Sequence, residues 1–145
     1  MGGVLAIDHG TRVSGFASTD SLRIATSALP AVRAPGDSEA LLDHLERLVT
    51  ERDVDVLLVG LPLDGQGHDT ARSKDVRRFA RRAALRLPTL AVCGWDEHLT
   101  TRAARELLVE EGVSKRKRQE LRDSYAALVL LRDWLAAGEP KTHPL

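Results

Sequence analysis

The 145-residue chain has one cysteine, Cys93, and few aromatic side chains: two tryptophans, two phenylalanines and one tyrosine. A single cysteine excludes an intramolecular disulfide and a cysteine-based zinc site. It also favours a reducing compartment, so we expect a cytoplasmic protein. Because aromatic residues are so scarce, we expect Trp95 and Trp134 to pack in the core rather than stack on a ligand.

Long apolar runs and an excess of one charge are also lacking. No segment approaches the roughly 20 apolar residues that a bilayer span requires. The opening run MGGVLAI has no basic start and ends at Asp8, so we expect no signal peptide. The formal net charge is zero, so any affinity for nucleic acid must come from local clusters of charge. The length suits a single domain, which we expect over residues 1–137, followed by a flexible tail over 138–145.

The hydrophobic pattern predicts strands first and then alternating helices and strands. Three short apolar runs predict an antiparallel meander that Pro30 and Pro35-Gly36 close. A continuous aliphatic run then predicts a strand that is covered on both faces. This order of elements predicts an α/β fold, with a mixed sheet of about five strands and helices on both faces. The expected strands are 4–8, 13–19, 22–29, 54–62 and 90–94. The expected helices begin at a cap and end near residues 52, 87, 112 and 137: the caps are Ser38 for the first, Asp69 or Thr70 for the second and Thr100 or Thr101 for the third, and the last helix begins near residue 119.

Three acidic residues stand where a buried carboxylate would need a partner. Asp8 follows the first expected strand, Glu97 stands just past the last, and Asp123 shares the inner face of the final helix with Ala127 and Leu130. Ligands of such sheets collect at the carboxyl ends of parallel strands, so we expect the three carboxylates to converge at that edge. Their mutual repulsion requires a hard cation, and Mg²⁺ or Mn²⁺ suits an all-oxygen site. Two such ions roughly 4 Å apart would suit phosphodiester hydrolysis.

Each acid taken alone also has an ordinary structural explanation. Asp8 could start a turn, Glu97 could be a solvated loop residue that competes with Asp96, and Asp123 could be an exposed helix acid. Only the combination of the three acids favours a functional site.

Charged residues are distributed unevenly along the chain. The segment 69–87 is rich in Arg and Lys, whereas the segment 37–55 is rich in Asp and Glu. Four consecutive cations at 115–118 stand next to an expected helix N-terminus, where the helix dipole disfavours positive charge. This placement favours contacts with phosphate, and the alternative is that both basic segments are solvated faces.

Five stretches of the sequence match a known family in order and at similar spacing. They are AIDHGTRVSGFASTD, VGLPLDGQGHDTARSKDVRRFA, WDEHLTT, EEGVSKRKR and RDSYAALVLL. On these motifs the chain resembles the YqgF family, also called RuvX, whose members are described as candidate Holliday junction resolvases related to RuvC. The match covers nearly the whole chain, and it implies a ribonuclease H-like fold.

The resemblance implies a metal-dependent nuclease that hydrolyses phosphodiester bonds. Carried over by position, it makes Asp8, Glu97 and Asp123 the catalytic, metal-binding acids, with Mn²⁺ or Mg²⁺ as the cofactor. The implied substrates are branched DNA or the 5′ end of the precursor of small-subunit (16S) ribosomal RNA. Paired cuts across a four-way junction would favour a homodimer. We assign candidate nucleic-acid contacts to Thr11, Arg12, His98, Thr100, Lys115, Arg116, Lys117 and Arg118.

Two positions depart from the family pattern, and two other functions fit parts of the sequence. Val13 stands where a second basic residue is usual in the family, and His98 stands where arginine is usual. We therefore expect this chain to differ from the family in its contacts with the substrate.

Actin-like ATPases also place Asp-x-Gly-Thr on a phosphate-binding hairpin, but they close two such lobes over a nucleotide and this chain supplies one. A non-catalytic nucleic-acid or ribosome-associated binding protein could keep the fold, although retention of all three acids disfavours it.

Overall fold

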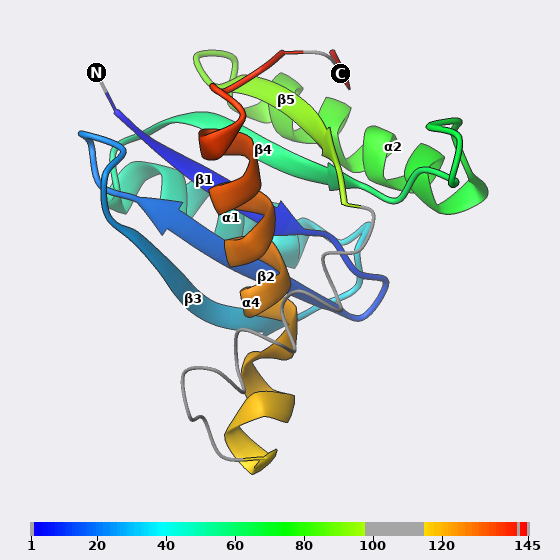
Figure 1. Ribbon diagram of the computed structural model, residues 1–145, viewed down its shortest axis with the longest axis horizontal. Helices are drawn as coiled ribbons and strands as arrows, with labels where there is room; N and C mark the ends of the chain where they lie inside the picture. The colour runs from blue at the N-terminus through cyan, green and yellow to red at the C-terminus, as the bar shows by residue number, and fades with distance from the viewer. Residues whose placement is uncertain (1, 98–114, 142, 145) are drawn as a thin grey trace.

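The computed structural model describes residues 2–97, 115–141 and 143–144, and a mixed β-sheet forms its centre (Figure 1). The strand order is β3-β2-β1-β4-β5-β6. β1, β2 and β3 form the predicted antiparallel meander, whereas β4 runs parallel to β1 and β5 runs parallel to β4. The mixed sheet of five long strands is thus confirmed, and a two-residue sixth strand lies beside β5. The strands are β1 Gly3–Asp8, β2 Val13–Thr19, β3 Thr26–Arg33, β4 Val54–Leu61, β5 Ala91–Asp96 and β6 His143–Pro144.

Helices cover both faces of the sheet, as predicted. α1 (Glu39–Glu51) and α2 (Ala71–Arg86) pack on one face, and α4 (Lys115–Ala136) crosses the other, where it lies in front of the sheet in Figure 1. The side chains of β4 alternate between the two cores: Leu57 and Val59 pack with α1 and α2, whereas Leu58 packs with α4. The aliphatic run at 54–62 is therefore a central strand buried on both faces. In the part of the chain that is described, no helix has the length and apolar character needed to cross a bilayer.

Side-chain caps begin the two helices on the first face. The Ser38 hydroxyl accepts a hydrogen bond from the Leu41 amide at 3.3 Å. Thr70 and Ser73 form a reciprocal capping box: the Thr70 hydroxyl accepts from the Ser73 amide at 3.0 Å, and the Ser73 hydroxyl accepts from the Thr70 amide at 2.7 Å. The predicted cap Ser38 is thereby confirmed, and of the two candidate caps of the second helix the structure has Thr70 rather than Asp69.

The third strand differs from the sequence-based prediction. We expected it over 22–29, with Pro30 and Pro35-Gly36 closing the meander, but β3 runs from Thr26 to Arg33, so it contains Pro30 and ends just before Pro35. Its pairing with β2 shifts by one residue between Ser14 and Phe16, which leaves an irregularity opposite Gly15. β3 is an edge strand of the sheet, and edge strands and bulges are the places where a sheet tolerates proline.

Two other elements extend beyond their predicted ends. β5 continues to Asp96 rather than ending at residue 94, so Glu97 follows it directly. α4 begins at Lys115 rather than near 119, which puts the four cations of 115–118 inside the helix. The helix expected over 101–112 lies outside the described residues.

The end of the chain contacts the domain at several points. The Trp134 indole Nε1 donates to the Pro140 carbonyl at 2.8 Å, and Arg23 of the β2–β3 hairpin forms an ion pair with Glu139. β6 then pairs with β5 in antiparallel orientation. The expected domain limit at residue 137 and the expected flexible tail stay predictions.

Candidate active site

The site lies where the parallel strands β1, β4 and β5 end at one edge of the sheet. Asp8 is the last residue of β1, and Glu97 directly follows β5. The Glu97 amide donates to the Leu61 carbonyl at 3.1 Å, so the β4–β5 ladder fixes the backbone of this acid. The side chains of Asp8 and Glu97 share a hydrogen bond.

A glycine in β4 makes room for the Glu97 carboxyl group. A Cβ atom at Gly60 would lie 2.6 Å from Glu97 Oε2 and 3.1 Å from Leu130 Cδ2 of α4. The carboxyl group therefore rests on the bare backbone of β4, on the face of the sheet that α4 covers. Any side chain at Gly60 would displace it.

A second glycine lets α4 bring the third acid to the site. Gly15 of β2 pairs with Asp8 in the sheet register. A Cβ atom at Gly15 would lie only 2.1 Å from the carbonyl oxygen of Asp123 and 2.5 Å from the amide nitrogen of Ser124. The backbone of α4 thus touches the sheet beside Asp8, and the charge of Asp123 acts on that carboxyl group.

Burial and repulsion favour the protonated forms of the two hydrogen-bonded acids. Burial raises the pKa of Asp8 to about 8, with further increases from the negative charges of Glu97 and Asp123. Burial also raises the pKa of Glu97, whereas the positive charge of Arg72 lowers the pKa of both acids. Without a cation, the pair is therefore stabilised by a retained proton.

The three predicted acids are brought together only in part. Asp8 and Glu97 are in direct contact, and Asp123 is close enough to Asp8 for its charge to matter. Within residues 2–97 and 122–141, whose side chains are described, no group of three His, Cys, Asp or Glu residues is arranged to hold a metal ion. The convergence of all three acids on a cation stays a prediction.

A buried histidine that sequence reasoning did not single out follows Asp8. His9 is 8% exposed, and its ring packs against Phe79 with centroids 4.6 Å apart. Its Nε2 lies 2.7 Å from the Gly36 carbonyl, which can only accept, and its Nδ1 lies 2.9 Å from the Arg72 guanidinium, which can only donate. These partners fix the neutral tautomer with hydrogen on Nε2. Burial lowers the pKa of His9 and favours the same neutral form.

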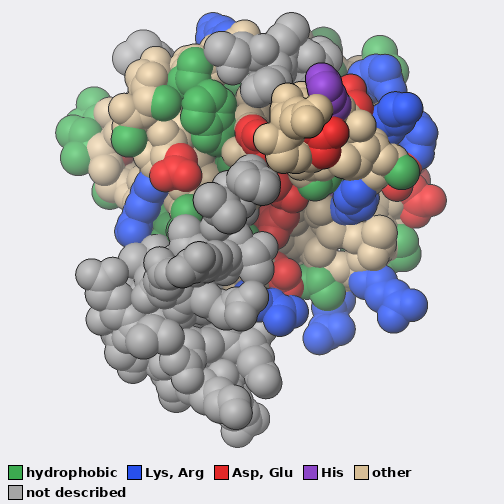
Figure 2. Space-filling model, turned by 45° about the vertical axis from the view of Figure 1, so that its right-hand side comes forward, with side chains coloured by type: hydrophobic (Ala, Val, Ile, Leu, Met, Phe, Trp, Pro, Cys, Tyr) green, Lys and Arg blue, Asp and Glu red, His purple; other side chains and the backbone are tan. Residues whose placement is uncertain are grey.

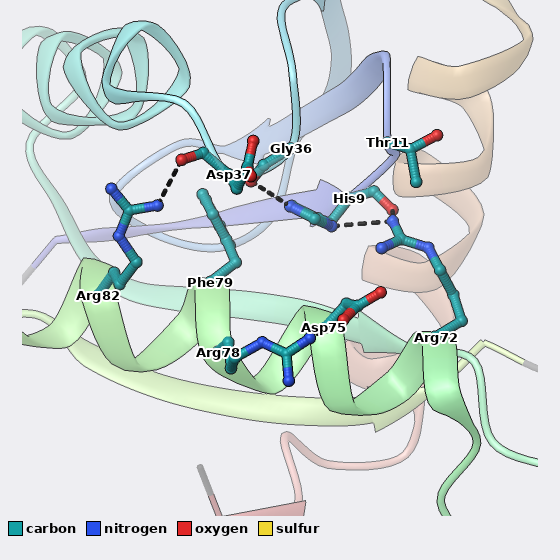
Figure 3. Close-up of a pocket in the computed structure, with 9 residues that line it drawn as sticks. All are labelled: His9, Thr11, Gly36, Asp37, Arg72, Asp75, Arg78, Phe79 and Arg82. Atoms are coloured by element: carbon teal, nitrogen blue, oxygen red, sulfur yellow. Dashed lines mark hydrogen bonds and ion pairs between the residues drawn. The ribbon is translucent and has the colours of Figure 1, made fainter.

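A cleft of about 470 Å³ opens beside this histidine (Figure 3). Its walls come from the β1–β2 turn, the segment before α1 and the first three turns of α2. Thr11, one of the predicted nucleic-acid contacts, lies in this wall. The lining residues are His9, Thr11, Gly36, Asp37, Arg72, Asp75, Arg78, Phe79 and Arg82.

The other predicted contacts fall elsewhere. Arg12 is exposed in the β1–β2 turn and does not line the cleft. His98 and Thr100 lie outside the described residues. Residues 115–118 form the first turn of α4, which projects beyond the sheet in Figure 1. The side chains of Lys115, Arg116, Lys117 and Arg118 are not among those described.

Much of the charge on α2 is neutralised within the fold. Arg86 forms ion pairs with Glu39, Asp43 and Glu46 of α1, and Arg82 also pairs with Glu39. The acidic and basic segments seen in the sequence therefore partly face each other rather than forming two separate surfaces. Figure 2 shows acidic side chains near the middle of its view, with Lys and Arg side chains along the right and lower edges.

Comparison with known proteins identifies the family. The family model for RuvX, described as Holliday junction resolvase, matches residues 2–137. The chain belongs to the RuvX family. Relatives named as candidate pre-16S rRNA nucleases include one from Dictyoglomus thermophilum, 34% identical over 96% of this chain and 99% of the relative. Another, from Myxococcus xanthus, is 35% identical over 94% of this chain and 89% of the relative.

Solved structures of resolvases share the fold of this RuvX family member. RuvC of T. thermophilus, solved with a Holliday junction substrate, superimposes with a TM-score of 0.60 at 15% identity, covering 97% of this chain and 99% of RuvC. The fowlpox virus resolvase, solved with Holliday junction DNA, gives a TM-score of 0.61 at 10% identity, covering 95% of this chain and 99% of the viral protein. The predicted ribonuclease H-like fold is confirmed.

Proposed function

We propose that this RuvX family member is a metal-dependent nuclease whose Asp8, Glu97 and Asp123 carboxylates hold the catalytic cations. The observation that carries the proposal is the half-buried, hydrogen-bonded pair of Asp8 and Glu97 at the carboxyl edge of the sheet, with the Asp123 charge acting on it. Acids with strongly raised pKa values are candidates for function, because strongly shifted pKa values are common at active sites. At such a site a bound proton or cation relieves the repulsion between the carboxyl groups.

The donor chemistry of the site fits Mg²⁺ or Mn²⁺. Its candidate ligands are all carboxylate oxygens, which hard divalent cations prefer. When bound there, one or two such ions would supply the positive charge that activates water and stabilises the leaving oxygen of a phosphodiester. Asp8 and Glu97 would give up their shared proton to the solvent as they take up the cation.

The names of the relatives and of the family suggest two substrates, both nucleic acids. The curated relatives are named for precursor 16S ribosomal RNA, and the family description names the Holliday junction. Cleavage of a four-way junction needs two symmetric cuts, so that substrate would require a homodimer. Cleavage of RNA would need only one chain.

A side-by-side assay tests the proposal. The purified protein is incubated with single-stranded RNA, duplex DNA and a four-way DNA junction, in Mn²⁺, in Mg²⁺ and in a chelator. We expect cleavage of at least one substrate only when metal is present. Mn²⁺ alone should also raise the Tm, because a ligand that binds only the folded state stabilises it by about 2.7 kcal/mol at a hundred times its Kd. Salt-sensitive binding without cleavage in either metal would support the non-catalytic alternative instead.

A further inference from the structure

Arg72 is the arginine of the cleft wall that forms no ion pair with another residue whose side chain is described. The other two arginines in the cleft wall are paired, Arg78 with Asp75 and Arg82 with Glu39. Among the described residues, no carboxylate oxygen lies within 4.0 Å of the Arg72 guanidinium. Its side chain is half-buried, and its charge acts on Asp8 and Glu97 without a direct ion pair to either, so the guanidinium can still make a direct contact with an anionic ligand.

The position of Arg72 is fixed by His9 rather than by an acid. Its Nη2 donates both to the Nδ1 atom and to the carbonyl oxygen of His9. The histidine ring is itself held between the Gly36 carbonyl and Phe79. In Figure 3, Arg72 rises from α2 to meet His9 at the end of the cleft near Thr11. Two neutral acceptors thus orient the guanidinium without neutralising it.

The cleft has the size for a phosphate group of a polynucleotide, and it has one arginine outside the ion pairs of the described residues. Of the three arginines and two aspartates in its wall, Arg78 and Arg82 are neutralised by Asp75 and Glu39, which leaves Arg72 and the single carboxylate of Asp37. A volume of about 470 Å³ is larger than a single phosphate needs, so a neighbouring sugar or base also fits. The cleft begins at His9, the residue after Asp8, so a strand lying in it would pass beside the acid pair.

We propose that Arg72 binds a backbone phosphate next to the scissile one, and that His9 is the positioning residue that aims it. The inference rests on the proposed nuclease function and adds to it the direction in which the substrate strand leaves the acids, along the cleft between α2 and the segment before α1. The ligand is recognised as a phosphodiester, so RNA and branched DNA would both use this subsite.

Binding measured without cleavage tests the subsite. Fluorescence anisotropy with labelled single-stranded RNA and with a four-way DNA junction, in a chelator, gives Kd for the wild type and for Arg72→Gln. Loss of a hydrogen bond to a charged phosphate should raise Kd about tenfold to a hundredfold. On single-stranded RNA the slope of log affinity against log salt should fall in magnitude by about 0.7. Arg81→Gln is the matched control, because Arg81 is exposed on the same helix and does not line the cleft.

Inorganic phosphate tests the chemistry of the subsite directly. At equal ionic strength, phosphate should weaken binding of RNA to the wild type more than chloride does, and Arg72→Gln should abolish that difference. Equal losses of affinity in Arg72→Gln and Arg81→Gln would overturn the subsite while leaving the nuclease intact. If the wild type binds neither RNA nor the junction, the proposed function fails and the subsite fails with it.

The role of His9 is tested by coupling. His9→Phe keeps a ring against Phe79 but removes the side-chain acceptor, whereas His9→Asn keeps an acceptor near the Nδ1 position. If His9 aims Arg72, His9→Phe should weaken RNA binding about as much as Arg72→Gln, the double variant should lose no more, and His9→Asn should recover part of the loss. Additive losses in the double variant, with equal effects of Phe and Asn, would show that His9 only supports the fold.

Discussion

Gly15 of β2 lies directly beneath the main chain of Asp123, so that a Cβ atom at this glycine would stand 2.1 Å from the Asp123 carbonyl oxygen. Because Gly15 also pairs with Asp8 across the β1–β2 ladder, this contact sets how closely α4 approaches the acid pair. The absence of a Cβ atom at Gly15 thus allows α4 to place the third acid beside Asp8.

Replacing Gly15 by alanine should therefore damage both stability and activity. The added methyl group must push α4 away from β2, at a cost of about 1–3 kcal/mol for overpacking. Thermal unfolding should show a lower Tm, and the metal-dependent cleavage rate should fall further than the fraction of folded protein does. Gly65→Ala is the control, because a Cβ atom there meets nothing within 4 Å. A Gly15→Ala protein with wild-type Tm and rate would show that α4 does not depend on this contact.

The raised pKa of Asp8 should give the metal-free protein an unusual dependence of stability on pH. The pKa of Asp8 is raised from 3.8 to about 8, so the folded state holds a proton that the unfolded state has lost in this range. The stability that Asp8 contributes is therefore complete below about pH 4 and is lost as the pH rises to about 8. His9 and His44, whose pKa values are lowered, act in the opposite direction near pH 6.

The contribution of Asp8 is isolated by comparison with Asp8→Asn. The Tm of the wild type minus that of the variant, measured in a chelator, should decrease steadily from pH 5 to pH 8. A difference that stays constant over this range would contradict the raised pKa of Asp8.

The cations at 115–118 in the first turn of α4 lead to a separate prediction about the salt dependence of nucleic-acid binding. If two of the cations at 115–118 meet phosphates of a single strand, changing all four to glutamine should reduce the salt slope by about 1.4. Affinity should fall on every substrate alike, because backbone contacts carry no sequence information. Saturating substrate should restore a near-normal cleavage rate, since a contact that is equal in ground and transition states does not change turnover. An unchanged salt slope would identify the segment as a solvated face.

Local signals in the sequence were sufficient for most of the fold. Ser38 and Thr70 begin helices because each supplies a capping oxygen to an amide three residues later, which depends only on nearby sequence. The doubly buried β4 and the positions of Asp8 and Glu97 at strand ends also follow from local hydrophobic runs. The choice of acids for the site could therefore be made before the structure was known.

Features that depend on distant partners could not be predicted in this way. Whether Pro30 ends a strand or lies within one depends on its being at the sheet edge, which is a property of the strand order. The contact between His9 and Arg72 joins residues 63 positions apart, and nothing in the sequence around either residue predicts it. The pairing of Arg86 with three acids of α1 likewise required the two helices to be placed side by side.

The cleavage rate of Asp8→Asn in Mn²⁺ tests the assignment of the metal site most directly. The amide keeps the size of the side chain and removes the carboxylate, so the variant should fold in a chelator while losing at least about a hundredfold in rate. Asp133→Asn, an exposed acid on α4, is the control and should cleave like the wild type. An Asp8→Asn protein that is folded and cleaves at the wild-type rate would contradict a catalytic cation held by Asp8, Glu97 and Asp123.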